Sequence, residues 1–438
     1  MMKRLRFTRL VSTVLLAVLL LGMPARASAE QRIIVRTGGL LSGLTVVQSA
    51  CKLLGCKVLY GLDGSLGKLF LVSVDDSLDV SIVFKLLGGV LGVVGVEYDR
   101  TVWTEGGDGN GSQVPPALLD NDPVSYYGTS VRGGYARQPA FGIVGLEEAH
   151  NRYGLTGRNV TVAVIDTGVD PNHPVLAGVL LPGYDFTRNR DGGSERSDVN
   201  QSTMSILDGN AGWVNQSTMA ILDQSTMAIL DGPDYAAFGH GTMVAGIIHL
   251  AAPKAKILPL KAFNANGSGY KSDVLRALYK ASSQGAKVIN MSFSFDEPSK
   301  ELEKAVEYVT SRGAIAVAST GNDGKKTNVY PASYSTVIGV ASTTDWDALS
   351  SFSNYGTSVA WIAAPGEAVV TTYPFGSYAA AWGTSFSTPF AAGTAALLSE
   401  GSSSISNSQA ADAEGNGVWI SWEVAKGRLH APTAIRSR

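Results

Sequence analysis

Short apolar segments alternate with helical patterns through the middle of this 438-residue chain. Five of these segments have the length of buried strands, at residues 160–165, 256–259, 288–291, 314–318 and 337–341. Helical patterns between the later ones begin near Ser272 and Ser299 and end at Gly285 and Gly313, with polar residues first and glycine last. Strands that alternate with helices usually form one parallel sheet with helices on both faces. We therefore expect an α/β fold built on a mostly parallel sheet.

Residues 30–104 predict a separate and smaller unit. Strand-like segments lie at 32–35, 57–60, 69–74 and 94–98, and the two intervening helix faces consist of Val46, Val47, Ala50, Leu53 and Leu54, and of Val80, Val83, Phe84 and Leu87. The order βαββαβ is that of the ferredoxin-like arrangement. A small α+β domain is therefore expected before the main sheet.

The first 29 residues have the pattern of a secretory signal peptide. Four basic residues precede an apolar run at 11–23, and Ala27, Ser28 and Ala29 supply the small residues of a cleavage site. A membrane anchor is the alternative, but the run is shorter than the ~20 apolar residues that span a bilayer. We expect a secreted protein, extracellular or in the cell envelope.

Oxidising export would let Cys51 and Cys56 pair, and a small buried-thiol role is equally compatible with the sequence.

Two further segments stand out, one between the expected units and one within the main domain. Residues 105–138 are rich in Gly, Asn, Asp, Ser and Pro and predict an exposed linker, where proteolysis acts. Residues 139–438 then hold the main domain, interrupted at 200–231 by a tandem repeat of the motif Q-S-T-M-A/S-I-L-D. We interpret the repeat as an inert loop, because long surface insertions are tolerated, with an apolar flap as the alternative.

Three separated motifs supply the parts of a nucleophilic triad. They are V-I-D-T-G around Asp166, G-H-G-T-M-V-A-G around His240 and G-T-S-F-S-T-P around Ser385. A serine hydroxyl is a poor nucleophile at neutral pH, so it needs an imidazole to take its proton and a carboxylate to orient the imidazole. We assign these roles to Ser385, His240 and Asp166. Pro389 predicts that Ser385 stands at the start of a helix, with the proline in its first turn.

The order Asp, His, Ser with these flanking residues resembles the subtilisin family of serine proteases. The resemblance covers roughly residues 139–397 and implies a serine endopeptidase that cleaves polypeptides through an acyl-enzyme. In S-T-G-N-D-G, Asn322 matches the oxyanion asparagine of the family. The segments similar to the family's substrate cradle contribute Gly267, Ser268, Gly269, Ser292, Phe293, Ser294 and Gly321.

The position of residues 30–104 is similar to that of a subtilisin-type propeptide. The resemblance implies a zymogen whose propeptide helps the enzyme to fold and inhibits it until cleavage, with the maturation site within 105–138. Slow folding of non-local parallel sheets gives such a template a physical purpose. An unrelated small domain with the same pattern is the alternative.

Several positions depart from the family. Ser294 and Val329 stand where the family has glycine, so we expect a narrower first pocket that favours small apolar side chains. Phe386 replaces a methionine after the nucleophile, which removes an oxidation-sensitive group. Val175 occupies the place of a calcium-binding aspartate, and the usual calcium loop is missing after His249 and Leu250. We therefore assign no metal ligands and expect no required cofactor, leaving calcium at another site open.

The small net charge gives no evidence for a charged partner. A formal net charge of −2 gives no electrostatic argument for nucleic acid or for an anionic membrane as a partner. We expect a monomer without stable membrane association, whose partners are polypeptide substrates and its own propeptide. Two rival functions fit the same motifs, a peptide-binding pseudoprotease without activity and an esterase that uses the same triad.

Overall fold

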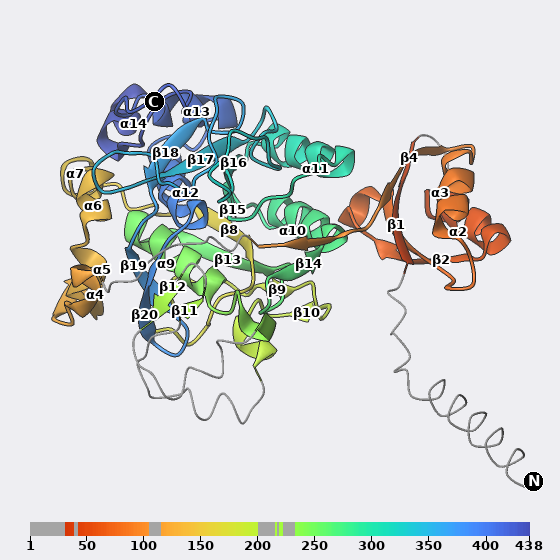
Figure 1. Ribbon diagram of the computed structural model, residues 1–438, viewed down its shortest axis with the longest axis horizontal. Helices are drawn as coiled ribbons and strands as arrows, with labels where there is room; N and C mark the ends of the chain where they lie inside the picture. The colour runs from red at the N-terminus through yellow and green to blue at the C-terminus, as the bar shows by residue number, and fades with distance from the viewer. Residues whose placement is uncertain (1–30, 39–42, 105–114, 200–214, 217–218, 222–232) are drawn as a thin grey trace, which may run out of the picture. The chain divides into compact units, whose positions relative to one another are not determined.

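A computed structural model describes residues 31–38, 43–104, 115–199, 215–216, 219–221 and 233–438 (Figure 1). The described chain divides into two compact units. The smaller unit comprises the residues up to Gly61 together with Gly67–Tyr98, and the larger unit comprises Leu62–Leu66 and Asp99–Arg438. The predicted signal peptide at 1–29 lies outside the described residues.

The smaller unit is a four-stranded antiparallel sheet with two helices. Its elements follow the predicted order βαββαβ, and the strands lie side by side in the order β2-β3-β1-β4. They are β1 (Gln31–Thr37), α2 (Gly43–Leu54), β2 (Cys56–Gly61), β3 (Leu69–Val74), α3 (Val80–Gly88) and β4 (Val93–Tyr98).

The buried face of α2 differs from the predicted one. Leu53 is exposed and Val46 is only half-buried, whereas Cys51 is buried. The residues of α2 that join the core of this unit are Val47, Ala50, Cys51 and Leu54. Their spacing of three and four residues keeps them on one helix face, whereas Val46 and Leu53 lie beside that face.

Cys51 and Cys56 form a disulfide, which selects one of the two possibilities that the sequence left open. The bond joins the last turn of α2 to the first residue of β2. It therefore holds the helix-to-strand turn of the smaller unit closed.

The larger unit contains an eight-stranded sheet in the order β10-β9-β13-β8-β15-β16-β17-β18 (Figure 1). From β9 to β18 the neighbouring strands run parallel, and only β10 is antiparallel to its neighbour. All five predicted strands are present, and the α/β expectation is confirmed. The strands are β8 (Thr161–Asp166), β9 (Tyr184–Asp185), β10 (Arg190–Asp191), β13 (Lys256–Lys261), β15 (Val288–Met291), β16 (Ile315–Ser319), β17 (Ile338–Thr343) and β18 (Ile362–Pro365).

Helices cover both faces of this sheet. Val162 and Val164 of β8 join the core cluster that contains α9 (His240–Ala251) and α12 (Thr384–Gly401). Ala163 and Ile165 are fully buried too, and alternation along a strand turns them to the opposite face. On that face α10 (Lys271–Ser283) contacts β8 and β13, and it packs on α11 (Lys300–Ser311).

Helix α10 starts near Ser272 as predicted, but this serine is not its N-cap. The helix begins after Tyr270, and Ser272 lies inside its first turn. The carboxylate of Asp99 caps this turn, because it accepts hydrogen bonds from the backbone N–H (2.8 Å) and the hydroxyl (2.9 Å) of Ser272. Helix α11 does begin as predicted, with the hydroxyl of Ser299 accepting from the N–H of Leu302 at 3.1 Å.

The predicted linker is wrong from residue 116 onward. This stretch forms α4 (Pro116–Leu119), β6 (Pro123–Tyr126), β7 (Thr129–Arg132) and α5 (Gly133–Ala136), and Leu118 is buried in the core of the larger unit. Tyr126 and Tyr135 are buried as well, and their hydroxyls donate to the carbonyls of Leu250 and Gly246 in α9. The segment is polar overall, and Leu118, Tyr126 and Tyr135 are irregularly spaced, so its composition did not predict that these residues are buried. Residues 105–114 lie outside the described residues.

The described part of the repeated insert extends a second sheet. Strand β11 (Asn215–Gln216) pairs with β12 (Met219–Ile221), which runs antiparallel to β20 (Ser377–Ala381) beside β19 (Val369–Tyr373). Both short strands belong to the second copy of the repeat. The first and third copies lie outside the described residues.

The chain ends in two helices that pack on the same core. Helices α13 (Asn407–Glu414) and α14 (Ala431–Ser437) contribute buried alanines, which agrees with a docked terminus. The shorter elements of the larger unit are η1 (Gly64–Leu66), β5 (Thr101–Trp103), α6 (Pro139–Ile143), α7 (Leu146–Tyr153), η2 (Glu195–Asp198), η4 (Pro233–Tyr235) and β14 (Ser268–Tyr270).

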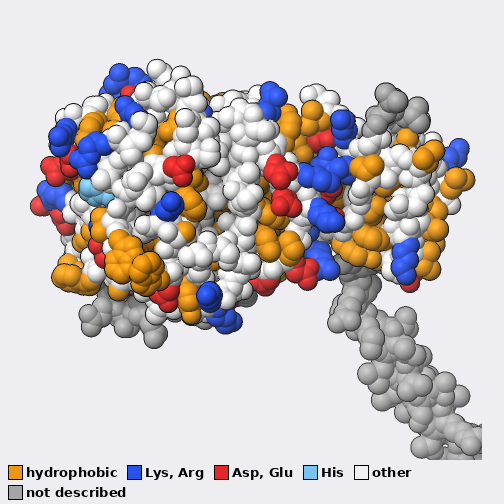
Figure 2. Space-filling view, turned by 90° about the horizontal axis from the view of Figure 1, so that it is seen from above, with side chains coloured by type: hydrophobic (Ala, Val, Ile, Leu, Met, Phe, Trp, Pro, Cys, Tyr) orange, Lys and Arg blue, Asp and Glu red, His pale blue; other side chains and the backbone are white. Residues whose placement is uncertain are grey.

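Basic and acidic side chains are interspersed on the face that Figure 2 shows, in keeping with the small net charge. Of the helices that the structure describes, none combines the length and the apolar character needed to cross a membrane.

Candidate active site

The structure brings Asp166 and His240 into direct contact. Asp166 is the last residue of β8 and His240 the first of α9, and both are buried. Nδ1 of His240 lies 2.7 Å from Oδ1 of Asp166, which also accepts from the N–H of Thr167 at 2.7 Å. A carboxylate can only accept, so Nδ1 carries a proton, and in the neutral imidazole Nε2 keeps its lone pair. Within the described residues, Nε2 has no hydrogen-bond partner.

Ser385 is the second residue of α12. Its hydroxyl donates to the carbonyl of Ser292 at 3.2 Å rather than to His240. The next side chain, Phe386, is buried with its ring centroid 5.4 Å from that of His240. The residue after the nucleophile candidate therefore contacts the imidazole, while the hydroxyl of Ser385 itself is bonded to Ser292.

Pro389 does not occupy the first turn of α12, contrary to expectation. The helix begins at Thr384, so the proline lies inside it. Because proline has no N–H, the carbonyl of Ser385 loses its helical partner. The hydroxyl of Ser292 replaces that partner and donates to this carbonyl at 2.9 Å.

Asn322 follows β16 and approaches the same helix start. Its Oδ1 accepts from both the backbone N–H (2.9 Å) and the hydroxyl (3.0 Å) of Thr384. These two donors fix the orientation of the amide, and Nδ2 has no partner within the described residues. The N–H of Ser385 belongs to the first turn of α12, where backbone donors have no helical acceptor. Both groups are thus available to stabilise an oxyanion.

An extended segment of the chain itself lies against the predicted substrate cradle. Strand β5 (Thr101–Trp103) pairs antiparallel with β14, so that Val102 lies opposite Gly269. The pairing continues with a hydrogen bond from the N–H of Thr104 to the carbonyl of Gly267 at 2.7 Å. Val102 and Thr104 are buried and Trp103 is exposed, as in a bound strand that presents alternate side chains to a surface.

The opposite wall of the cradle is only partly as expected. A cavity of about 830 Å³ is lined by Thr104, Ser294, Phe295 and Asn322, among others. Phe293 lies in the interior instead, with its ring centroid 5.1 Å from that of Phe263. The other residues predicted to shape this wall, Ser292, Gly321 and Val329, are buried and do not line this cavity.

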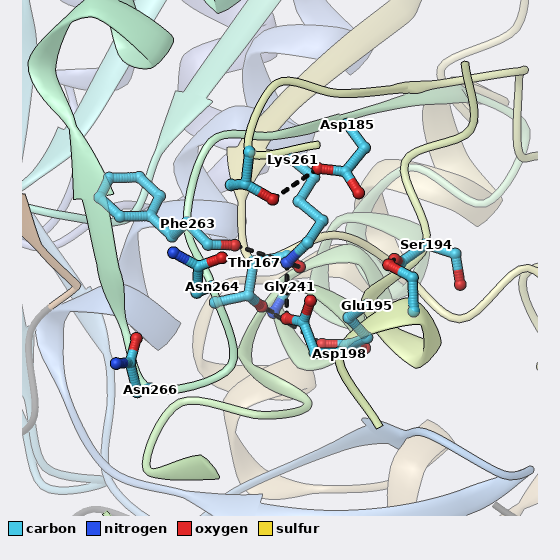
Figure 3. A network of polar contacts seen from close by, with 12 residues as sticks. Thr167, Asp185, Ser194, Glu195, Asp198, Gly241, Lys261, Phe263, Asn264 and Asn266 are labelled. Atoms are coloured by element: carbon cyan, nitrogen blue, oxygen red, sulfur yellow. Dashed lines mark hydrogen bonds and ion pairs between the residues drawn. The ribbon is translucent and has the colours of Figure 1, made fainter. Parts of the chain in front are cut away.

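A buried polar network adjoins the contact between Asp166 and His240, and no motif of the sequence singled out its centre (Figure 3). The carboxylate of Glu195, on η2, is fully buried among donors from two motifs. Burial raises the pKa of Glu195 to about 8; the nearby carboxylates add to the rise, whereas the Thr242 hydroxyl and the Lys261 ammonium oppose it. Only the threonines that follow Asp166 and His240 in the motifs hint at such a partner.

Within the part of the chain that the structure describes, no group of three or more His, Cys, Asp or Glu side chains is placed to hold a metal ion. Val175, at the position of the family's calcium-binding aspartate, is a buried member of the apolar core. The side chain at this position offers no oxygen to a calcium ion.

A parallel α/β sheet that carries an aspartate, a histidine and a serine in this order defines a serine hydrolase. The model of the subtilase family matches residues 157–416, and the chain belongs to this family. It is 37% identical over 296 residues to thermitase from Thermoactinomyces vulgaris, covering 64% of this chain and 90% of thermitase. Subtilisin Savinase from Lederbergia lenta is 37% identical over 270 residues, covering 60% and 83%.

The solved structure of fervidolysin from Fervidobacterium pennivorans has the same fold, with a TM-score of 0.69 at 21% identity. The match covers 94% of this chain and 62% of the fervidolysin chain. Family membership and these relatives make the protein a serine endopeptidase that acts on polypeptides.

Proposed function

We propose that this chain is a secreted endopeptidase made as a zymogen, which hydrolyses peptide bonds through an acyl-enzyme on Ser385. The observation that carries the proposal is the pairing of β5 with β14, which leads an extended peptide to the cavity where Asn322 lies. An enzyme that acts on polypeptides needs such a surface for main-chain pairing.

In the proposed acylation, the hydroxyl of Ser385 turns from Ser292 to Nε2 of His240 and gives up its proton as its oxygen attacks the carbonyl carbon. Asp166 holds the imidazole in the tautomer that can accept this proton and stabilises the positive charge that results. The oxyanion receives hydrogen bonds from Nδ2 of Asn322 and from the N–H of Ser385. His240 then returns the proton to the leaving amine, and water hydrolyses the ester in the reverse sequence.

The zymogen part of the proposal assigns residues 30–104 as the propeptide. Its last described residues, Thr101–Thr104, hold the cradle strand β14 and keep other chains from pairing there. Since these residues run into the predicted linker, we place the maturation cleavage directly after Thr104, at the start of 105–138. Residues 1–29 would direct export.

Labelling with a fluorophosphonate tests the activity. The full chain is expected to release residues 30–104 and to react with the probe, and Ser385→Ala is expected to do neither. A correctly processed chain that never reacts would favour the rival peptide-binding pseudoprotease. Turnover of small esters without cleavage of any peptide in a library would favour the esterase.

A pair of substitutions in β5 tests the inhibitory role of this strand. Val102→Asp places a charge at a buried position and is expected to shorten the lag before full activity of the maturing chain. Trp103→Asp makes the same change at an exposed neighbour and serves as the matched control. Equal lags for both variants would contradict the assignment.

A further inference from the structure

A single buried carboxylate, that of Glu195, contacts both segments that form the site (Figure 3). Its Oε2 accepts from the hydroxyl of Thr167 at 3.2 Å and from the backbone N–H of Gly239 at 2.8 Å. Its Oε1 is hydrogen-bonded to the hydroxyl of Thr242. Three donors from two separate motifs therefore converge on one side chain.

The two threonine hydroxyls have no freedom in this arrangement. Oγ1 of Thr167 accepts from the N–H of Gly241 at 3.0 Å, and Oγ1 of Thr242 accepts from the N–H of Asp170 at 2.7 Å. Each hydroxyl accepts a backbone N–H with one of its two lone pairs and directs its own proton to Glu195. The ionised carboxylate accepts both protons, whereas a neutral amide in its place would face one of the donors with its NH₂ group. Because burial raises the pKa of Glu195 to about 8, the two side chains are compared above that pH.

The backbone groups held in this way flank the reacting side chains. Thr167 directly follows Asp166, and Gly239 and Gly241 lie on either side of His240. The segments meet at backbone contact, because a Cβ on Gly241 would lie 2.0 Å from the carbonyl oxygen of Gly168. Any displacement of one segment is therefore passed to the 2.7 Å contact between Asp166 and His240.

Glu195 is itself held in place from the other side. Nζ of the fully buried Lys261 donates to Asp198 on η2 (2.7 Å), to the carbonyl of Thr167 (2.7 Å) and to the carbonyl of Phe263 (2.6 Å). The ammonium thus ties the 3₁₀ helix that bears Glu195 to the residue after Asp166 (Figure 3).

We propose that Glu195 is a positioning residue, which sets Asp166 against His240 by holding the backbone on both sides of the pair. The inference rests on the catalytic roles proposed above for these two residues. Glu195 also lies at the N-terminus of α9, where a carboxylate stabilises a helix. Capping alone would change the stability of the protein and leave kcat unaltered, so kinetics distinguish the two roles.

The test compares kcat and KM of the mature enzyme on one peptide substrate for Glu195→Gln, Thr167→Val and Thr167→Ser. Because misplacement by about 1 Å can cost 10²-fold in rate, we expect kcat to fall roughly 10- to 100-fold in the first two, with KM within about twofold. Thr167→Ser keeps the hydroxyl and is expected to restore kcat to within about threefold. The matched control is Glu414→Gln, a fully buried carboxyl in α13.

The outcomes separate the two levels of the argument. A wild-type chain that neither labels nor cleaves peptides overturns the proposed function. An active wild type with unchanged kcat in Glu195→Gln and Thr167→Val overturns the positioning role, whatever happens to the unfolding temperature. If Glu195→Gln fails to fold, Thr167→Val carries the test, since it breaks the same connection by removing one hydroxyl. The double variant Glu195→Gln/Thr167→Val is expected to have a kcat no lower than that of Thr167→Val alone, because both substitutions disrupt the same hydrogen bond.

Discussion

The hydroxyl of Ser292 is expected to stabilise the start of α12, and its removal gives the sharpest test of the site's architecture. Pro389 cannot bond the carbonyl of Ser385, and Ser292 supplies the missing donor at 2.9 Å. In Ser292→Ala this carbonyl is left unpaired in a fully buried segment, which costs about 1–3 kcal/mol. The upper half of this range applies, because Nδ2 of Asn290 also loses its acceptor at 3.0 Å.

The assay is the free energy of unfolding from denaturant titration, measured in a His240→Ala background so that the chain does not digest itself. A double-mutant cycle with Pro389→Ala isolates the argument, since alanine returns an N–H to the position that bonds the carbonyl of Ser385. In that background Ser292→Ala is expected to cost about 1 kcal/mol less.

Ser294→Ala is the control, because this serine lies two residues along the same loop and faces the cavity. It is expected to change the free energy of unfolding by less than about 0.5 kcal/mol. An equal cost of Ser292→Ala with and without Pro389 would refute the reasoning, and so would a cost no larger than that of the control.

Three further predictions follow from buried polar groups. Asn322→Ala is expected to lower kcat by about 10²–10³, a magnitude measured in subtilisin itself, and an unchanged kcat in steady-state kinetics would exclude the oxyanion role. Burial raises the pKa of Glu414 well above its usual value, so its folded form resists ionisation and stability is lost as pH rises above that value. Glu414→Gln should therefore raise the midpoint temperature of thermal unfolding more at pH 8 than at pH 4. An equal shift at both pH values would contradict the inference that burial raises the pKa of Glu414. Lys261→Met removes the ammonium partner of the buried Asp198, which keeps the guanidinium of Arg188, and leaves the carbonyls of Thr167 and Phe263 without this donor. It should cost about 1–3 kcal/mol in denaturant titration, whereas a loss below about 0.5 kcal/mol would show that this ammonium contributes little.

The sheet could be predicted because its strands are short, apolar and buried on both faces. Runs such as 162–165 contain no polar residue and therefore mark central parallel strands. The contact between Asp166 and His240 was equally accessible, since one residue ends a strand of this sheet and the other begins a helix beside it. Strong local sequence patterns thus predicted both the sheet with its covering helices and the site residues at the ends of these elements.

The parts that the sequence missed depend on contacts between distant residues. Glu195 stands in a polar stretch, and only the folded chain shows that it meets Thr167 and Thr242. Tyr126 and Tyr135 anchor a segment whose composition predicts a loop, because two phenolic rings bury enough surface to order it. Neither kind of contact leaves a periodic pattern, so hydrophobic spacing cannot find it.

The polar atoms of the site fall into two sets with opposite purposes. Oδ1 of Asp166, Oδ1 of Asn322 and the carbonyl of Ser385 are each satisfied by donors from other segments. Three atoms of these side chains have no hydrogen-bond partner within the described residues, namely Nε2 of His240, Nδ2 of Asn322 and Oδ2 of Asp166, although a buried unpaired group costs about 1–3 kcal/mol. Two of them, Nε2 of His240 and Nδ2 of Asn322, are the atoms that would take the proton of Ser385 and bind the oxyanion. The stability given up at these two atoms is therefore recovered only when a substrate reacts, which is how a site favours the transition state over the resting protein.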